Sequence, residues 1–129
     1  MREILFRGKK CDEWFEGCLL YDEENNKAFI AEYFEDESAY LREVIPETIG
    51  QYTGVTDRKG KKIFEGDIVY EYNVLGKRSD KKYVVTWEDI FVRWSIAECH
   101  GMYGSEHIAF YEIIGNVHDN PELLKGDLI

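Results

Sequence analysis

Positive charges in the second part of the chain are gathered into two short stretches. Residues 50–129 contain ten Lys and Arg residues, and eight of the ten lie in these stretches. Basic side chains at this density can bind phosphates or other anions if the fold brings the two stretches together. Charge runs in loops more often reflect solvation alone, so solvated loop tips are the simpler interpretation. The candidate anion- or nucleic-acid-binding residues are Arg58, Lys59, Lys61, Lys62, Lys77, Arg78, Lys81 and Lys82.

Thiol and imidazole side chains offer a second kind of chemistry, metal binding. The relevant residues are Cys11, Cys18, Cys99, His100 and His107. Neither gap between the cysteines has the two-to-four-residue spacing of a zinc knuckle. We therefore predict no metal site and no cofactor. We expect at least two of the three thiols to be buried as small apolar side chains.

Recognisable catalytic patterns are missing from the sequence. It has no Gly-rich phosphate loop, no nucleophile elbow and no His-Glu-x-x-His. His118 and Asp119 are adjacent, but neighbouring side chains diverge in an extended chain and rarely make a catalytic contact. The three Trp and nine Tyr residues could stack on bases or sugars, but more simply they form the core of a small β domain. We predict no catalytic residues and no enzyme activity.

Length and charge limit the function classes further. The chain has 129 residues and a formal net charge of −10, which disfavours coating of nucleic acid or anionic membranes by the whole surface. No apolar run approaches the roughly 20 residues needed to cross a bilayer. The first residues are too charged for a signal peptide. Together with three loosely spaced cysteines, this favours a cytoplasmic protein with reduced thiols and no membrane partner.

The elements that would position these residues are short β-strands. Apolar and polar side chains alternate in 67–72, 83–87 and 90–96, as in half-buried strands. Asp57–Gly60 has the composition of a type I turn, and Gly66 permits a positive φ before the next strand. Asn120 and Pro121 fit the N-cap and first residue of a helix of one or two turns, with Gly126 as its stop.

The first part of the chain is more acidic and less regular. Residues 1–49 have 6 basic and 13 acidic side chains, against 10 and 13 in residues 50–129. Residues 2–9 and 14–21 are expected to pair as a hairpin, with a further strand at 28–31. Residues 32–43 fit either an acidic helix or a loop with an edge strand, and Pro46 is expected to end that element. We predict an acidic β-rich lobe over 1–49 packed with a small β-barrel region over 50–129.

Three segments resemble the YopX family. They are residues 44–69, VIPETIGQYTGVTDRKGKKIFEGDIV, the opening 2–8, REILFRG, and the ending 113–124, IIGNVHDNPELL. The resemblance implies a bacteriophage or prophage protein in a bacterial host cell. It also implies an SH3-type β-barrel in the C-terminal part. It supplies no catalytic residues and no assigned molecular function.

Two kinds of function remain open on these grounds. The favoured one is a non-enzymatic protein-binding or adaptor module that binds a host or phage protein, or a second copy of itself, through an exposed aromatic patch or a barrel edge. A variant binds basic host proteins through the acidic lobe. The alternative is a nucleic-acid-associated module that uses the two basic stretches.

Overall fold

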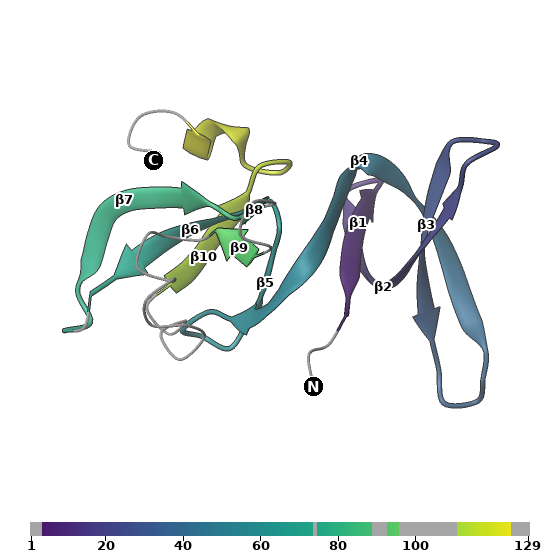
Figure 1. The fold of residues 1–129 in the computed structure, drawn as a ribbon, viewed down its shortest axis with the longest axis horizontal. Helices are drawn as coiled ribbons and strands as arrows, with labels where there is room; N and C mark the ends of the chain where they lie inside the picture. The colour runs from purple at the N-terminus through teal and green to yellow at the C-terminus, as the bar shows by residue number, and fades with distance from the viewer. Residues whose placement is uncertain (1–3, 74, 89–92, 96–110, 125–129) are drawn as a thin grey trace. The chain divides into compact units, whose positions relative to one another are not determined.

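The protein is mainly β (Figure 1), as the computed structural model shows for residues 4–73, 75–88, 93–95 and 111–124. The chain divides into two compact units, Met1–Tyr52 (unit 1) and Thr53–Ile129 (unit 2). Strand β4, Ala39–Thr56, supplies residues to both units. The sequence-based boundary between residues 49 and 50 falls inside this strand.

Unit 1 is an antiparallel sheet of four strands in which the first and fourth strands also pair with each other. The strands are β1 (Phe6–Lys10), β2 (Glu13–Asp22), β3 (Lys27–Tyr33) and the first part of β4. Each strand pairs with the next, and β4 also pairs with β1. The predicted hairpin of the first two strands is confirmed by their pairing. The sheet is therefore partly closed, which reduces the length of its unpaired edges.

Pro46 does not end the element in which it lies, contrary to the sequence-based expectation. Strand β4 continues through it because the pairing with β1 shifts register between Arg7↔Gly50 and Lys9↔Ile45. The Thr48 side chain forms hydrogen bonds to the backbone in this irregular stretch. Its Oγ1 accepts the Lys9 N–H at 2.9 Å and donates to the Ile45 carbonyl at 2.6 Å. A proline is tolerated where a ladder is interrupted in this way.

The core of unit 1 is small and depends on two glycines. Ala28, Ile30 and Val44 are buried, and partly buried residues pack around them: Phe6, Phe15, Leu19 and Ile49. A Cβ at Gly8 would lie 2.7 Å from a methyl carbon of Val44, and one at Gly17 would overlap the backbone oxygen of Ala31. Both glycines therefore permit the close approach of strands in this sheet.

Unit 2 contains a three-stranded antiparallel sheet and a separate strand pair. The sheet has the order β10–β6–β7, formed by Tyr111–Asn116, Asp67–Tyr72 and Arg78–Val84. Strand β8, Thr86–Glu88, pairs with β9, Arg93–Ser95. The short β5, Lys62–Phe64, pairs with β4, and a 3₁₀ turn, η2, spans Pro121–Leu124.

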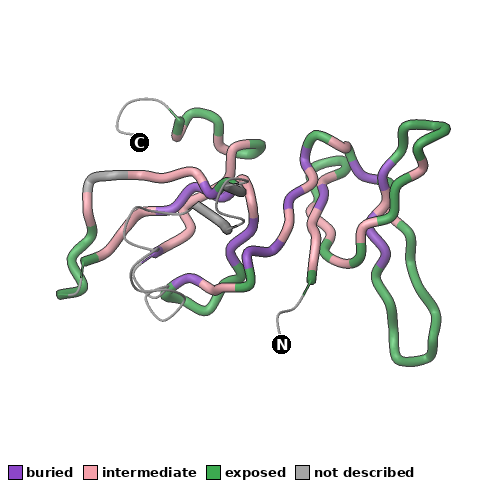
Figure 2. Tube along the Cα trace, viewed as in Figure 1, coloured by how far each residue is buried: buried purple, intermediate pink, exposed green. Residues whose placement is uncertain are grey.

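A second core lies within unit 2 (Figure 2). Ile63, Val69, Val85 and Tyr111 are buried there. The Asp67 carboxylate is also buried, and its Oδ2 accepts the Phe64 N–H at 2.7 Å, which closes the turn that contains Gly66. Gly66 has a φ of 93°, the left-handed conformation for which the sequence predicted a glycine.

Several sequence-based predictions can be compared directly with these elements. The predicted strand 67–72 is β6, and the predicted turn of helix after Asn120 is the 3₁₀ turn η2. Residues 32–43 form the end of β3, a turn and the start of β4, so the acidic helix is wrong and the strand alternative is right. Gly126 and most of the predicted strand 90–96 lie outside the described residues. Within the described ranges, no helix is long and apolar enough to cross a membrane.

Candidate functional site

The first basic stretch is a turn held against the sheet of unit 2 by a buried aspartate. We call residues 57–61 the first basic turn. The Asp57 side chain is 3% exposed, and its Oδ1 accepts the N–H groups of Lys59 and Lys61, each at 2.9 Å. Its Oδ2 accepts the N–H of Ile113 on β10 at 3.1 Å. One carboxylate therefore closes the turn and fixes it to a strand 56 residues further along the chain.

The side chains that follow Asp57 lie over β6 and β10. The Arg58 guanidinium carbon is 3.8 Å from the centre of the Tyr72 ring, a stacking geometry that arginine favours. Lys59 Nζ lies 2.6 Å from Glu112 Oε2, and the Tyr72 hydroxyl donates to Glu112 Oε1 at 2.7 Å. The first basic turn therefore places the Arg58 guanidinium on the Tyr72 ring and the Lys59 ammonium against the Glu112 carboxylate.

The second basic stretch is not a loop as expected from the sequence, because Arg78, Lys81 and Lys82 belong to β7 and only Lys77 lies in a turn. That turn has the same construction as the first. We call residues 73–77 the second basic turn. Asn73 Oδ1 accepts the N–H groups of Leu75 and Lys77, as Asp57 Oδ1 accepts those of Lys59 and Lys61. Gly60 and Gly76 occupy equivalent positions, with φ of 85° and 80°. Both turns follow the pattern Asx-x-x-Gly-Lys, a sequence signal that predicts this geometry but was not recognised as a repeat.

Arg78, which follows the second basic turn, stacks on the next aromatic ring of β6. Its guanidinium carbon is 4.3 Å from the centre of the Tyr70 ring. Tyr70 and Tyr72 are two residues apart on one strand, so both rings lie on the same face of the sheet. We call this surface the stacked-arginine face; it consists of Arg58, Lys59, Tyr70, Tyr72 and Arg78.

The charges on this face alter each other's protonation. Hydrogen bonds from Lys59 and then Tyr72 hold the pKa of Glu112 below its ordinary value of 4.5. The same carboxylate raises the pKa of Lys59 above 10.5 and that of Tyr72 above 10.0. Near neutral pH Glu112 is therefore ionised while Lys59 is charged and Tyr72 is neutral.

The eight predicted basic residues do not behave as one group. Arg58, Lys59 and Arg78 converge on the stacked-arginine face, and Lys82 is paired with Tyr70 across the β6–β7 ladder. Lys61, Lys62 and Lys77 are exposed in or next to the turns, and the side chain of Lys81 lies outside the described part of the structure. The sequence missed Tyr72 and Glu112 as partners of these cations, because their contacts join strands 40 residues apart.

A second distinctive surface is the end of the β3–β4 hairpin in unit 1, which Figure 2 shows as almost wholly exposed. Tyr33, Tyr40 and Leu41 are 62%, 61% and 60% exposed. Phe34 packs edge-on against Tyr40, with ring centres 5.4 Å apart. The turn is tightened by Asp36 Oδ1, which accepts the Ser38 N–H at 3.0 Å. We call residues 32–41 the exposed hairpin.

An open pocket adjoins this hairpin. It has a volume of about 290 Å³, and two of its lining residues, Glu32 and Arg42, belong to β3 and β4. Arg42 lies over the Phe15 ring at 4.7 Å and over the Tyr40 ring at 5.5 Å. The pocket is lined by Trp14, Phe15, Glu16, Ile30, Glu32 and Arg42.

The remaining candidates from the sequence do not form a site among the described residues. Cys11 and Cys18 are exposed, so the expectation of at least two buried thiols is wrong: Cys11 lies in the β1–β2 turn and Cys18 on the exposed side of β2. Cys99, His100 and His107 lie outside the described residues. No group of three potential metal ligands occurs in the part of the chain that is described.

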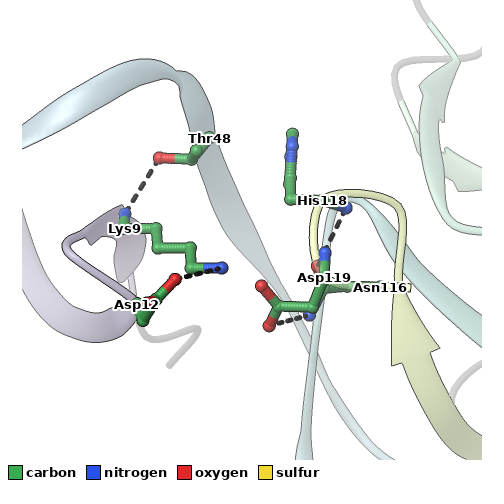
Figure 3. A network of polar contacts seen from close by, with 6 residues as sticks. All are labelled: Lys9, Asp12, Thr48, Asn116, His118 and Asp119. Carbon is green, nitrogen blue, oxygen red and sulfur yellow. Dashed lines mark hydrogen bonds and ion pairs between the residues drawn. The ribbon is translucent and has the colours of Figure 1, made fainter. Parts of the chain in front are cut away.

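The adjacent pair His118 and Asp119 belongs to a turn. Asn116 Oδ1 accepts the backbone N–H groups of both residues, at 3.0 and 2.9 Å, and Asn116 Nδ2 donates to the Asp119 carboxylate at 3.2 Å (Figure 3). The imidazole and the carboxylate point away from one another in this view. Figure 3 also shows the bond between Lys9 and Thr48 in unit 1, and the ion pair of Lys9 with Asp12 at 3.9 Å.

Comparison with known proteins places the chain in a family. No curated protein matches it. A solved structure, the crystal structure of protein EF1440 from Enterococcus faecalis, is similar with a TM-score of 0.62 and 23% sequence identity, over 97% of this chain and 100% of that one. At this identity the likeness concerns the fold alone. The YopX protein family matches residues 5–125, nearly the whole chain, and the protein therefore belongs to the YopX family.

Proposed function

We propose that the protein is a non-enzymatic protein-binding module, and that the exposed hairpin is its docking surface. The observation that carries the proposal is the exposure of Tyr33, Tyr40 and Leu41 at the end of one hairpin. The pairing of Ala31 with Leu41 and of Glu32 with Tyr40 places Tyr33 and Leu41 on one face of the hairpin and Tyr40 on the other. The hairpin therefore exposes large apolar side chains on both faces, and such exposed apolar surface marks interaction sites. Tyrosine in particular supplies a large contact area at a low cost in conformational entropy.

The charge around the hairpin indicates the kind of partner. Glu32, Glu35, Asp36 and Glu37 are exposed beside the apolar side chains, and residues 1–49 carry 13 acidic against 6 basic residues. A complementary surface would have an apolar centre surrounded by Lys or Arg. The pocket next to Arg42 offers room for one side chain of such a partner.

Membership of the YopX family supports a proposal for the biological setting. We place the protein among accessory proteins of bacteriophages and prophages, acting in the cytoplasm of the bacterial host on a host or phage protein. An SH3-type small barrel is our proposal for the architecture of unit 2. Small barrels commonly present loops and strand edges to partners, although that analogy concerns the fold and carries little weight for function.

Affinity capture from bacterial lysate with matched variants tests the proposal. The apolar variant is Y33S/L41S and the charge variant is E35K/E37K. Their controls are L75S, which alters a leucine that is 87% exposed in unit 2, and E23K/E24K, which reverses two exposed charges in the β2–β3 turn.

The expected result is a defined protein that is retained by the wild type and by both controls. It should be lost with the apolar variant, and its retention should weaken with the charge variant and at high salt. Equal capture by the apolar variant and the wild type would show that the exposed hairpin is not the docking surface. Recovery of the chain itself as the sole partner would replace the host or phage protein by a second copy.

A further inference from the structure

We propose that the stacked-arginine face of unit 2 binds the phosphate backbone of single-stranded nucleic acid. This site is separate from the exposed hairpin, which belongs to unit 1, and goes beyond the protein-binding function. It selects Arg58, Lys59 and Arg78 from the eight basic residues that the sequence singled out. The other basic residues contribute through their charge alone.

The cations of this face are held in place, unlike those of a solvated loop. The first basic turn is fixed to β10 by two independent contacts: Asp57 Oδ2 accepts the Ile113 N–H at 3.1 Å, and the Arg58 N–H donates to the Tyr111 carbonyl at 2.9 Å. Stacking on Tyr72 and Tyr70 restricts the side chains of Arg58 and Arg78. A binding site whose side chains are already ordered loses less entropy when a ligand arrives.

The arrangement repeats along β6, as an extended anionic ligand requires. Two residues of a strand span about 6.8 Å, so the Tyr70 and Tyr72 stacks are successive sites along one line. Guanidinium groups bind phosphate oxygens through paired N–H donors. One face of each guanidinium stacks on a tyrosine ring. The opposite face of the guanidinium offers a plane of the kind on which unpaired bases stack, which favours a single strand over a duplex.

Glu112 occupies the place of a ligand anion on this face. Its two carboxylate oxygens accept from Lys59 Nζ at 2.6 Å and from the Tyr72 hydroxyl at 2.7 Å, donors that a phosphate oxygen would also use. In the wild type Arg58 and Arg78 therefore carry most of the binding. Removing the charge of Glu112 should release Lys59 as a third cation.

The net charge of −10 is a sum over the whole chain and does not describe the charge at this face. Residues 50–129 contribute 10 basic and 13 acidic side chains, and two of the acidic ones, Asp57 and Asp67, are buried and bound to backbone N–H groups. On the face itself, the cations Arg58, Lys59 and Arg78 outnumber the one contacting carboxylate, Glu112, so the local field is more positive than the total charge implies.

Fluorescence anisotropy with a labelled oligothymidylate of about 12 nucleotides, within the range of known single-strand sites, tests the proposal. Binding is measured at about 50 and 200 mM salt. With two phosphate contacts the affinity should fall about sevenfold over this range, and with three contacts about eighteenfold, from a slope of about 0.7 per contact. The wild type should follow the first value and E112Q the second.

The variant R58A/R78A should lose at least about tenfold in affinity at low salt. The variant K10A/K27A is its matched control, because it removes two exposed cations from unit 1. Circular dichroism and thermal unfolding establish that each variant is folded. The milder R58K/R78K keeps the charge and loses the stacked plane, so it should lie between R58A/R78A and the wild type.

Several results would overturn the proposal. Equal losses in R58A/R78A and K10A/K27A would show that total charge, and not this face, determines binding. Competition by polyglutamate as effective as that by unlabelled oligonucleotide would assign the face to acidic peptides. Tighter binding of a duplex of the same length would exclude single-strand recognition, and absence of binding at 50 mM salt would exclude a nucleic-acid site.

Discussion

Replacing Asp57 with alanine removes the acceptor that closes the first basic turn and fixes it to β10. Three backbone N–H groups, those of Lys59, Lys61 and Ile113, lose their partner. A hydrogen bond to a charged group contributes about 1.5–3 kcal/mol. Lys59 and Lys61 are exposed and their N–H groups can bind water instead, so the loss is concentrated at the half-buried Ile113. We expect D57A to lower the free energy of unfolding of unit 2 by about 3 kcal/mol.

Two further variants separate the turn from its attachment to the sheet. In D57N the amide oxygen can still accept from Lys59 and Lys61, as the Asn73 oxygen does in the second basic turn, but the amide nitrogen cannot accept from Ile113. We expect D57N to cost about 1–2 kcal/mol. The bonds of the Asn73 side chain to described residues stay within its own exposed turn, to the N–H groups of Leu75 and Lys77. We therefore expect N73A to cost about 1 kcal/mol or less.

Amide hydrogen exchange followed by NMR resolves these effects. Exchange at Val69, which is fully buried in β6, reports global unfolding of unit 2, and exchange at Ile113 reports the attachment of the turn. D57N should increase exchange at Ile113 much more than at Lys59 and Lys61. If D57A and N73A lower the stability equally, or if D57N leaves exchange at Ile113 unchanged, the structural role given to Asp57 is wrong.

Three other predictions follow from the packing and charge of the two units. G17A should lower the stability of unit 1 by about 1–3 kcal/mol, since its Cβ would overlap the Ala31 oxygen; thermal unfolding checks this, and a Tm equal to that of the wild type would contradict the close strand contact. Because the folded-state pKa of Glu112 is below 4.5, its contribution to stability is present above about pH 4.5 and is lost as the pH falls through the folded pKa. Unfolding of E112Q should therefore depend less on pH below about 4.5, and an unchanged acid profile would argue against the ion pair. I63A should destabilise unit 2 by about 2–5 kcal/mol through the cavity it leaves, measured by urea denaturation; a loss below about 1 kcal/mol would argue against the core given for unit 2.

The local elements of the fold were more predictable than its connections. Alternation of apolar and polar residues identified β6, and Asn120 with Pro121 identified the final turn, because both signals are contained in a few neighbouring residues. Pro46 was misread, since its tolerance depends on a register shift against β1, nearly 40 residues earlier. No pattern within 39–56 contains that information.

The candidate sites show the same division between local and long-range information. The two basic stretches were visible in the sequence, but which cations meet depends on stacking over β6 and on Glu112 of β10. The apolar residues of 32–43 were visible as well, but the sequence fitted both an acidic helix and a loop with an edge strand. Only the pairing of Glu32 with Tyr40 and of Ala31 with Leu41 places them at the end of an exposed hairpin.

Site-specific photo-crosslinking tests the central claim, that the exposed hairpin is the docking surface for a partner protein. A photoreactive phenylalanine analogue is placed at Tyr40, and in a separate protein at Leu75, a more exposed control position in unit 2. We predict that position 40 gives one dominant adduct with another protein in the host cell, that E35K/E37K weakens this adduct, and that position 75 does not form it. Adducts of equal yield at both positions, or none at position 40, would contradict the claim.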